Sequence, residues 1–304
     1  MKKRQLGKSD LYVSELGLGC MSLGTDFSQA ARIIDAALDE GINYFDTADL
    51  YDFGENERIV GQTLKPVRDK VIIATKAGNR WNENKDGWTW DPSKAYIMEA
   101  VKASLKRLQT DYIDLYQLHG GTIEDPIEET IEAFEELKQE GLIRYYGISS
   151  IRPNVIREYA AKSSAVSVML QYSMLDRRPE EEVFSVLEKH NISAVTRGSV
   201  AKGLLSDRFA QKAASDKGYL DYTSSELNDI LPLLKEKLAS DRTLEEASLL
   251  YNLSHPVVAS VVTGASSAEQ IRANARAVSG RPLNQDEIKL IHQLTKANKY
   301  TAHR

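Results

Sequence analysis

The sequence alternates between short apolar runs and amphipathic stretches, and this alternation restricts the fold more than any other feature. Eight runs rich in valine, isoleucine and tyrosine occupy residues 16–20, 42–46, 71–76, 113–119, 143–149, 167–171, 192–197 and 258–264. They are continuously apolar, as parallel strands buried on both faces are. The stretches between them repeat apolar residues at helical spacing, as Ile127, Ile131, Phe134 and Leu137 do. The eight repeats predict an α/β protein with a closed (β/α)8 TIM barrel rather than an open sheet.

Three segments lie outside the eight repeats. Residues 4–14, with the sequence RQLGKSDLYVS, predict an N-terminal β-hairpin. Residues 205–242 are long and polar, with a helix expected around 226–238 in which Pro232 marks a start or a kink. Residues 284–296 predict an extra C-terminal helix. No linker divides the chain, so we expect residues 1–304 to form a single barrel domain.

Charge and cysteine content narrow the class of protein. The formal net charge of −5 argues against nucleic acid or an anionic membrane as the main partner. Cys20 is the single cysteine, so no internal disulfide can form, and we expect a reducing, cytoplasmic location. The basic start of the chain is not followed by an apolar run, and no segment is long and apolar enough to suggest a membrane span.

The acidic segment NYFDTADLYDFGENE, residues 43–57, has several possible roles. Its aspartates stand three residues apart, which does not match a calcium-binding loop, and the five histidines are scattered, so we predict no metal site. Gly17, Gly19 and Ser22 resemble a dinucleotide fingerprint, with Asp46 at the end of the next apolar run. That pattern is weak here, because the following helix begins only near Ser28 and the later repeats do not suit a doubly wound sheet.

A catalytic role follows from position in the predicted barrel, where the C-terminal ends of the strands share one mouth. Asp46 ends the second strand, Tyr51 lies in the loop after it, Lys76 ends the third strand and His119 ends the fourth. Each side chain alone has a structural explanation, as a cap, an ion-pair partner or a packing group. Four ionisable groups from three successive strands instead indicate a site.

The chemistry of these four groups is coherent. An ammonium group such as that of Lys76 stabilises a neighbouring phenolate, which makes the Tyr51 phenol a better proton donor. The Asp46 carboxylate holds the ammonium group and keeps it charged. The His119 imidazole can hydrogen-bond a carbonyl oxygen and orient it. The set suits protonation of a carbonyl oxygen while a hydride reaches the carbon.

These residues also carry a resemblance to a known family. The segments FDTADLY, ATK, DYIDLYQLH and GISS resemble those of the aldo-keto reductase superfamily, in particular its bacterial members related to potassium-channel β-subunits. The likeness runs from ELGLGCMSLG to VTGASSAEQIRAN, nearly the whole chain. It implies an NADP(H)-dependent carbonyl reductase on a (β/α)8 barrel, with Asp46, Tyr51, Lys76 and His119 as the catalytic tetrad and a small carbonyl compound as substrate. The other acids of the segment, Asp49, Asp52, Glu55 and Glu57, are then expected to be solvated or to start the next helix, where acids are favourable.

The resemblance also implies a coenzyme site. Ser149 and Gln171 are expected at the nicotinamide carboxamide, with Ser150 beside them. The segment SVAKGLLSDR is expected at the pyrophosphate, and the start of the last repeat's helix at the adenine end, where a helix N-terminus favours phosphate. The full expected set is Ser149, Ser150, Gln171, Arg197, Gly198, Ser199, Lys202, Gly203, Leu205, Arg208, Gly264, Ser266, Gln270 and Asn274.

Several positions depart from the family pattern. Ser266 stands where many relatives have an arginine for the 2′-phosphate, which weakens the expected preference for NADP(H). Arg197 stands where most have an aromatic residue on the nicotinamide, and its guanidinium could cover that ring or reach the pyrophosphate. Trp81, Trp88 and Trp90 follow Lys76 closely, and they suit either a wall of the substrate pocket or packing of a loop onto the barrel rim.

Two other functions remain open from the sequence. One is a Schiff-base lyase that uses Lys76, although such a lysine must be neutral and Asp46 opposes that. The other is a coenzyme-binding sensor or regulatory module with little turnover, as the likeness to channel β-subunits allows. The sequence does not identify the physiological substrate or the oligomeric state.

Overall fold

A computed structural model describes residues 1–207, 209–210, 218–239 and 241–304. In this part of the chain, eight parallel strands close into a barrel in the order β10-β11-β12-β3-β4-β5-β8-β9. The strands are β3 (Leu16–Gly19), β4 (Tyr44–Asp46), β5 (Ile72–Ala77), β8 (Ile113–Leu118), β9 (Ile143–Ser149), β10 (Ser167–Gln171), β11 (Ser193–Arg197) and β12 (Val258–Thr263). Each falls within or overlaps one predicted apolar run, so the predicted (β/α)8 barrel is confirmed.

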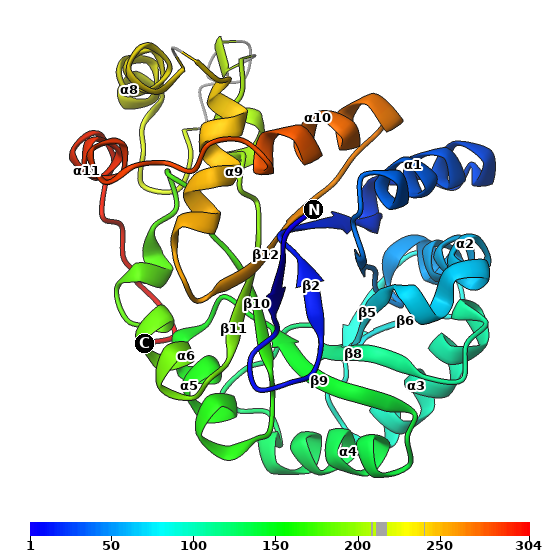
Figure 1. Cartoon of the computed structure of the whole chain (residues 1–304). Helices are drawn as coiled ribbons and strands as arrows, with labels where there is room; N and C mark the ends of the chain where they lie inside the picture. The colour runs from blue at the N-terminus through cyan, green and yellow to red at the C-terminus, as the bar shows by residue number, and fades with distance from the viewer. Residues whose placement is uncertain (208, 211–217, 240) are drawn as a thin grey trace.

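Helices surround the strands, as Figure 1 shows. Between the barrel strands lie α1 (Phe27–Asp39), α2 (Glu55–Leu64), α3 (Lys94–Leu108), α4 (Ile127–Gln139), α5 (Pro153–Lys162), α6 (Val183–Lys189) and α9 (Leu244–Ser254), and α10 (Ala268–Val278) follows the last strand. Their buried faces pack on the outside of the barrel and form the larger core. No helix in the described ranges has the length and apolar character needed to cross a membrane.

The predicted hairpin consists of β1 (Lys3–Gln5) and β2 (Tyr12–Ser14), paired antiparallel. Its side chains Leu6, Leu11 and Val13 are buried with Tyr44, Leu115 and other residues of the barrel interior in a second, smaller core. The hairpin thus closes the end of the barrel where the strands begin. The opposite end, where the strands finish, stays available for a site.

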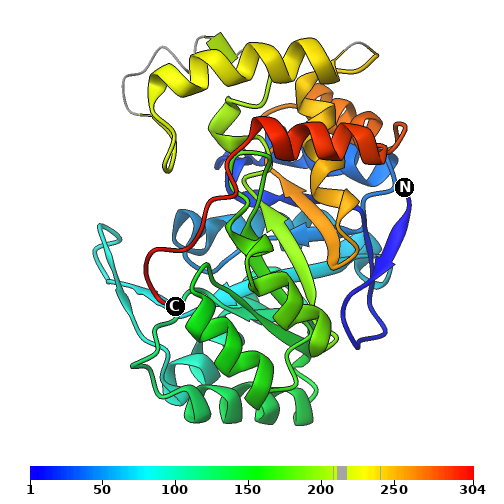
Figure 2. The same ribbon diagram turned by 90° about the vertical axis from the view of Figure 1, so that its left-hand side faces the viewer.

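Two helices lie outside the ring, α8 (Ser224–Leu238) and α11 (Gln285–Leu294), and they lie side by side in Figures 1 and 2. The C-terminal helix α11 is therefore confirmed. Thr223 and Glu226 form a capping box at the start of α8. Pro232 does not mark the start of the helix, because the cap starts it eight residues earlier and the helix continues past the proline.

Candidate active site

A cleft of about 1000 Å³ opens where the barrel strands end. Asp46, Tyr51 and His119 line one part of it, and Arg197, Gly198 and Gly264 line another. These residues follow strands β4, β8, β11 and β12, so the barrel brings together segments more than 200 positions apart in the chain. This volume is at the upper end of the range for ligand pockets, which is roughly 300–1,000 Å³.

Lys76 and Asp46 form a buried ion pair at the base of the cleft. The Lys76 Nζ lies 2.5 Å from Asp46 Oδ1 and 2.7 Å from the Thr47 carbonyl oxygen. Gln117 Nε2 donates to the other Asp46 oxygen at 3.2 Å. Burial opposes the charged form of Lys76, but the contacts with Asp46 and Tyr51 outweigh it and raise the lysine pKa. The ammonium group is therefore charged and fixed.

Tyr51 reaches this ammonium group from a short helical turn, η2 (Tyr51–Gly54). Its hydroxyl lies 3.5 Å from Lys76 Nζ. Asp52 and Phe53 adopt left-handed backbone angles, with φ of 48° and 51°, and Gly54 follows with φ of 85°. This turn reverses the chain before α2 and directs the phenol into the cleft.

His119 faces Tyr51 across the cleft. Their ring centroids are 5.8 Å apart, with the planes nearly perpendicular at 86°. Burial, with added repulsion from Lys76 and Arg197, lowers the pKa of His119 to about 3. The imidazole is therefore neutral in the physiological range, and its buried Nδ1 has no hydrogen-bond partner among the described residues.

A second acidic layer lies behind the Asp46–Lys76 pair. Glu57 is fully buried, accepts from Thr75 Oγ1 at 2.6 Å and pairs with Arg107 Nε at 2.5 Å. Asp49 is also buried, and Tyr96 donates to it at 3.3 Å. Burial and the nearby Glu57 raise the pKa of Asp49 to about 8.

This second layer corrects one interpretation of the acidic segment. Asp49 and Glu57, like Asp52 and Glu55, were expected to be solvated or to start a helix. Glu55 and Glu57 do lie in the first turn of α2, but neither Asp49 nor Glu57 is solvated. Glu57 is paired with Arg107, which comes from α3, 50 residues further along the chain.

The three tryptophans belong to an antiparallel pair of short strands, β6 (Asn79–Trp81) and β7 (Trp88–Trp90). Trp88 and Trp90 line the cleft, and the Trp90 indole donates to Asp125 at 3.0 Å. Trp81 instead packs against Phe53 and under the Arg107 guanidinium. Both sequence interpretations therefore hold in part: two tryptophans form a wall, and one anchors the strand pair.

The residues predicted to hold a coenzyme fall into two groups. Ser149, Ser150, Arg197, Gly198 and Gly264 line the cleft. Within this group, the guanidinium of Arg197 donates to Gln171 Oε1 at 3.3 Å.

The second group lies beside the cleft rather than in its lining. The Gln171 amide donates to Asp176 at 2.8 Å, and the Ser199 carbonyl oxygen accepts from Ser248. Leu205 is fully buried, Asn274 is buried and donates to Thr263, and Gln270 accepts from Ser266. Lys202 and Gly203 lie in the turn η5 (Ala201–Gly203). Arg208 lies outside the described residues.

Some residues of the site had no counterpart in the sequence analysis. Gln117 is buried behind the cleft and holds Asp46; it precedes His119 by two positions, and the polar residue within the apolar run LYQLH was a signal for it. Arg152 and the terminal segment 300–303 line the cleft itself. The terminal segment has no periodic pattern that could have placed it there.

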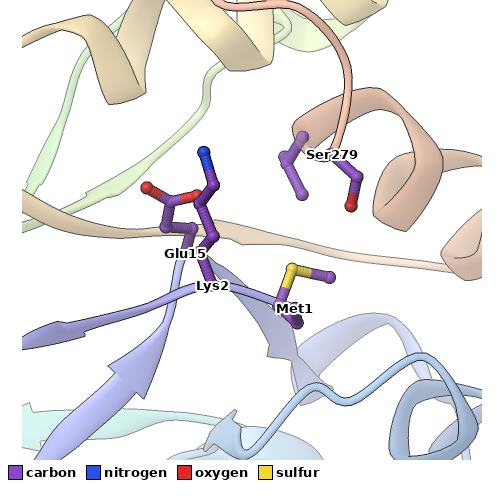
Figure 3. Close-up of a pocket in the computed structure, with 5 residues that line it drawn as sticks. Met1, Lys2, Glu15 and Ser279 are labelled. Carbon is purple, nitrogen blue, oxygen red and sulfur yellow. The ribbon is translucent and has the colours of Figure 1, made fainter.

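A smaller hollow of about 380 Å³ lies at the other end of the molecule, between Met1, Lys2, Glu15 and Ser279 (Figure 3). Glu15 comes directly before β3, at the end of the barrel that the hairpin closes. Arg4 pairs with Glu15 at 2.7 Å and neutralises it. This hollow is therefore separate from the cleft and has no comparable set of chemical groups.

Comparison with protein families matches residues 15–296 to a single model, described as the aldo/keto reductase family. The chain belongs to the aldo/keto reductase family. The predicted resemblance is confirmed, and the oxidoreductase class follows from it. Members of this family generally use a nicotinamide coenzyme and act on small carbonyl compounds.

Relatives of several kinds occur within the aldo/keto reductases. The chain is 59% identical to the "Uncharacterized oxidoreductase YqkF" of Bacillus subtilis over the full length of both. It is 32% identical to an "NADH-specific methylglyoxal reductase" of Escherichia coli, covering 92% of this chain and 94% of that one. It is 27% identical to a "Probable voltage-gated potassium channel subunit beta" of rice, Oryza sativa subsp. japonica, covering 95% and 94%.

Solved structures show the same relationship. The holo form of the aldo-keto reductase AKR11C1 from Bacillus halodurans is 62% identical, with a TM-score of 0.94. The match covers 100% of this chain and 99% of that one. The barrel fold is thus shared with an aldo-keto reductase of known structure.

Proposed function

We propose that this protein reduces aldehydes or ketones to alcohols, with NADPH as the coenzyme and Tyr51 as the proton donor. The observation that carries the proposal is the Tyr51 hydroxyl, which lies in a cleft 3.5 Å from a buried, ion-paired lysine. A phenol is a weak acid in water, and a fixed neighbouring ammonium group favours the phenolate that proton transfer leaves behind.

Each residue of the tetrad has a separate task. Tyr51 donates its proton to the carbonyl oxygen, and Lys76 stabilises the resulting phenolate. Asp46 keeps Lys76 charged and in place through the 2.5 Å contact. His119 is neutral, so its ring can donate one hydrogen bond to the substrate oxygen without repelling Lys76. A nicotinamide coenzyme bound in the cleft would supply the hydride.

The cleft is suited to a coenzyme of this kind. Ser149 and Ser150 present hydroxyl groups near the catalytic end, and Gly198 and Gly264 present backbone without side chains. Gly264 lies before α10, whose first turn carries the dipole that favours phosphate. These residues would hold the coenzyme, and Arg197 would lie beside its charged parts.

The two alternative functions fit the site less well. A Schiff-base lyase needs a neutral lysine, but Lys76 Nζ is engaged by Asp46, Thr47 and Tyr51 and its pKa is raised. A sensor or regulatory role has support from the relative described as a channel β-subunit. That role would show as coenzyme binding without turnover.

The direct test is to follow NADPH oxidation with a panel of aldehydes, ketones and dicarbonyls. We expect turnover with at least one class, and no covalent adduct on Lys76 after borohydride treatment. Tight coenzyme binding with no turnover on the whole panel would replace the reductase proposal with the sensor role.

The choice of coenzyme gives a separate prediction. Ser266 offers no charged contact to a 2′-phosphate, and one relative is described as NADH-specific. A charge-assisted contact to the 2′-phosphate would favour NADPH by roughly 10-fold or more. Without it, we expect catalytic efficiency with NADPH to exceed that with NADH by less than about 10-fold. Arg272 or Arg276 of α10 would supply the remaining attraction. The NADP assignment would be contradicted if the wild type used both coenzymes with equal catalytic efficiency and if Arg272→Ala and Arg276→Ala left that ratio unchanged.

Arg197 provides a further prediction, measured by binding alone. A guanidinium covering the nicotinamide at ~6 Å would disfavour the oxidised ring by at most ~3 kcal/mol, which solvent and salt reduce to ~1 kcal/mol. We favour this placement, so Arg197→Tyr should tighten NADP⁺ relative to NADPH by about fivefold. The readout is the pair of dissociation constants by calorimetry. Equal weakening of both forms would place Arg197 at the pyrophosphate instead.

A further inference from the structure

The charges that line the cleft do not balance. Four residues whose side chains carry a fixed charge at neutral pH line it, namely Asp46, Arg152, Arg178 and Arg197. Lys76 neutralises Asp46, and Asp176 holds Arg178 through two contacts of 2.7 Å. Neither Arg152 nor Arg197 forms an ion pair with any residue that the structure describes. The cleft therefore carries two uncompensated positive charges.

The two arginines come from different elements of the fold. Arg197 ends β11 next to Gly198 and contacts Gln171, all of which belong to the proposed coenzyme side. Arg152 precedes α5, and its Nη1 donates to the carbonyl oxygen of Gly121. Gly121 follows His119 by two residues, so Arg152 lies on the wall that continues from the catalytic histidine.

The contact with Gly121 holds Arg152 in a defined position. Gly120 and Gly121 have φ of 137° and 116°, which L-residues rarely adopt, and a Cβ on Gly120 would come within 3.2 Å of the Trp90 ring. The glycines thus let the backbone turn closely along Trp90 and present a carbonyl oxygen to Arg152. The Arg152 side chain is half-buried. The bond to Gly121 occupies only one of its five N–H donors.

We propose that Arg152 selects carbonyl substrates that carry an oxyanion, a carboxylate or a phosphate, a few atoms from the carbonyl group. The inference rests on the proposed reductase function, with the carbonyl oxygen placed at Tyr51 and His119. The planar guanidinium matches both oxyanions with paired hydrogen bonds. Trp88 and Trp90 line the same cleft, and the Trp90 ring lies beside Gly120.

The chain connectivity places Arg152 near the catalytic histidine. Two residues of extended chain span at most ~7 Å, so the Gly121 backbone cannot lie farther than that from the His119 backbone. The Arg152 guanidinium, bonded to Gly121, is therefore on the same side of the cleft as His119. Short oxo acids and small aldose phosphates, in which only a few atoms separate the carbonyl from the oxyanion, suit this arrangement.

The test compares substrate pairs that differ only in the oxyanion. The pairs are 4-oxobutanoate with butanal, for a carboxylate, and glyceraldehyde 3-phosphate with glyceraldehyde, for a phosphate. Catalytic efficiency for each is measured in the wild type, Arg152→Gln and Arg152→Lys. Arg157→Gln, on the same helix and paired with Glu182, is the control for loss of an arginine outside the cleft.

We expect the wild type to prefer at least one anionic member by about tenfold or more. Arg152→Gln keeps a donor for Gly121 but loses the charge, so it should lose this preference while neutral substrates change by less than about threefold. Arg152→Lys should retain part of the preference, and Arg157→Gln all of it. No preference in the wild type, or an equal loss for both members in Arg152→Gln, would overturn the assignment.

A binding measurement separates this proposal from the reductase function. In the presence of NADP⁺, 4-hydroxybutanoate should bind about tenfold more tightly than butan-1-ol in the wild type, and equally weakly in Arg152→Gln. Calorimetry detects the binding itself, so the measurement does not depend on the protein being able to turn the alcohol over. If neutral aldehydes are reduced but the two alcohols bind equally, the Arg152 proposal is wrong and the reductase function stands. If 4-hydroxybutanoate binds selectively but no aldehyde is reduced, the reductase function is wrong and the anion site at Arg152 stands.

Discussion

Replacing Tyr51 by phenylalanine is expected to lower the rate of carbonyl reduction by about 10²–10⁴-fold, the range for loss of a general acid. The ring is retained, so its packing against His119, at a centroid distance of 5.8 Å, should persist. What is lost is the hydroxyl 3.5 Å from Lys76. The measurement is single-turnover reduction of one good substrate, together with the dissociation constant of NADPH, which should hardly change.

Tyr12→Phe is the matched control, because Tyr12 is exposed on β2 at the closed end of the barrel. Its activity should equal that of the wild type. The pH profile adds a second criterion, because His119 with its pKa of about 3 should produce no change in rate between about pH 5 and 8. Turnover of Tyr51→Phe within about threefold of the wild type would remove Tyr51 from the mechanism.

Loss of Arg107 should be the most damaging change to stability among the variants considered. Arg107→Ala leaves Glu57 fully buried without its cation, beside the buried Asp49. Breaking a buried ion pair in this way costs roughly 3–5 kcal/mol. The free energy of unfolding in urea at pH 7 measures it. The exposed pair of Lys162 and Glu128 is the comparison, where Lys162→Ala should cost less than ~1 kcal/mol.

The pH dependence of the same experiment has a defined sign. Asp49 keeps its proton in the folded protein up to about pH 8 but loses it near ~4 when unfolded. Between these values the folded state binds more protons, so this group lowers the free energy of unfolding as the pH rises. Asp49→Asn should flatten that slope.

A double variant tests the charge explanation for the Arg107→Ala loss. Glu57→Gln with Arg107→Met removes both charges, so it should recover much of the stability lost in Arg107→Ala. An equal or larger loss would show that packing, not charge, is responsible.

The barrel was predictable because its signals are local. Each parallel strand is buried on both faces and reads as an apolar run, and each helix repeats its apolar face within a few turns. The strand ends that carry Asp46, Lys76 and His119 were predictable for the same reason. Once eight repeats imply a closed barrel, the ends of neighbouring strands must share one mouth.

Features that depend on distant partners were not predictable. Glu57 and Asp49 lie in a segment as acidic as a solvated loop. Glu57 is buried because Arg107 from α3 pairs with it, and Asp49 is buried because its raised pKa keeps it protonated. Arg152 precedes a proline at a helix start, and no motif around it indicates a site. Only its contact with Gly121 in the folded protein places it near His119. The terminal segment lies at the cleft through contacts with distant residues, among them the bond from Asn154 N–H to the His303 carbonyl oxygen and the Arg178 guanidinium over the Tyr300 ring, and no local pattern encodes them.

The strand pair β6–β7 has a spectroscopic consequence. The chain has three tryptophans, and all of them lie in this pair beside the cleft, so the intrinsic emission of the protein originates next to the proposed site. The indoles differ in environment: Trp88 is 55% exposed, Trp81 lies under a guanidinium, and Trp90 is bonded to a carboxylate. Reduced nicotinamides absorb where tryptophan emits, so binding should quench the fluorescence by energy transfer. Replacing one tryptophan at a time would show how much each of the three indoles contributes to this quenching.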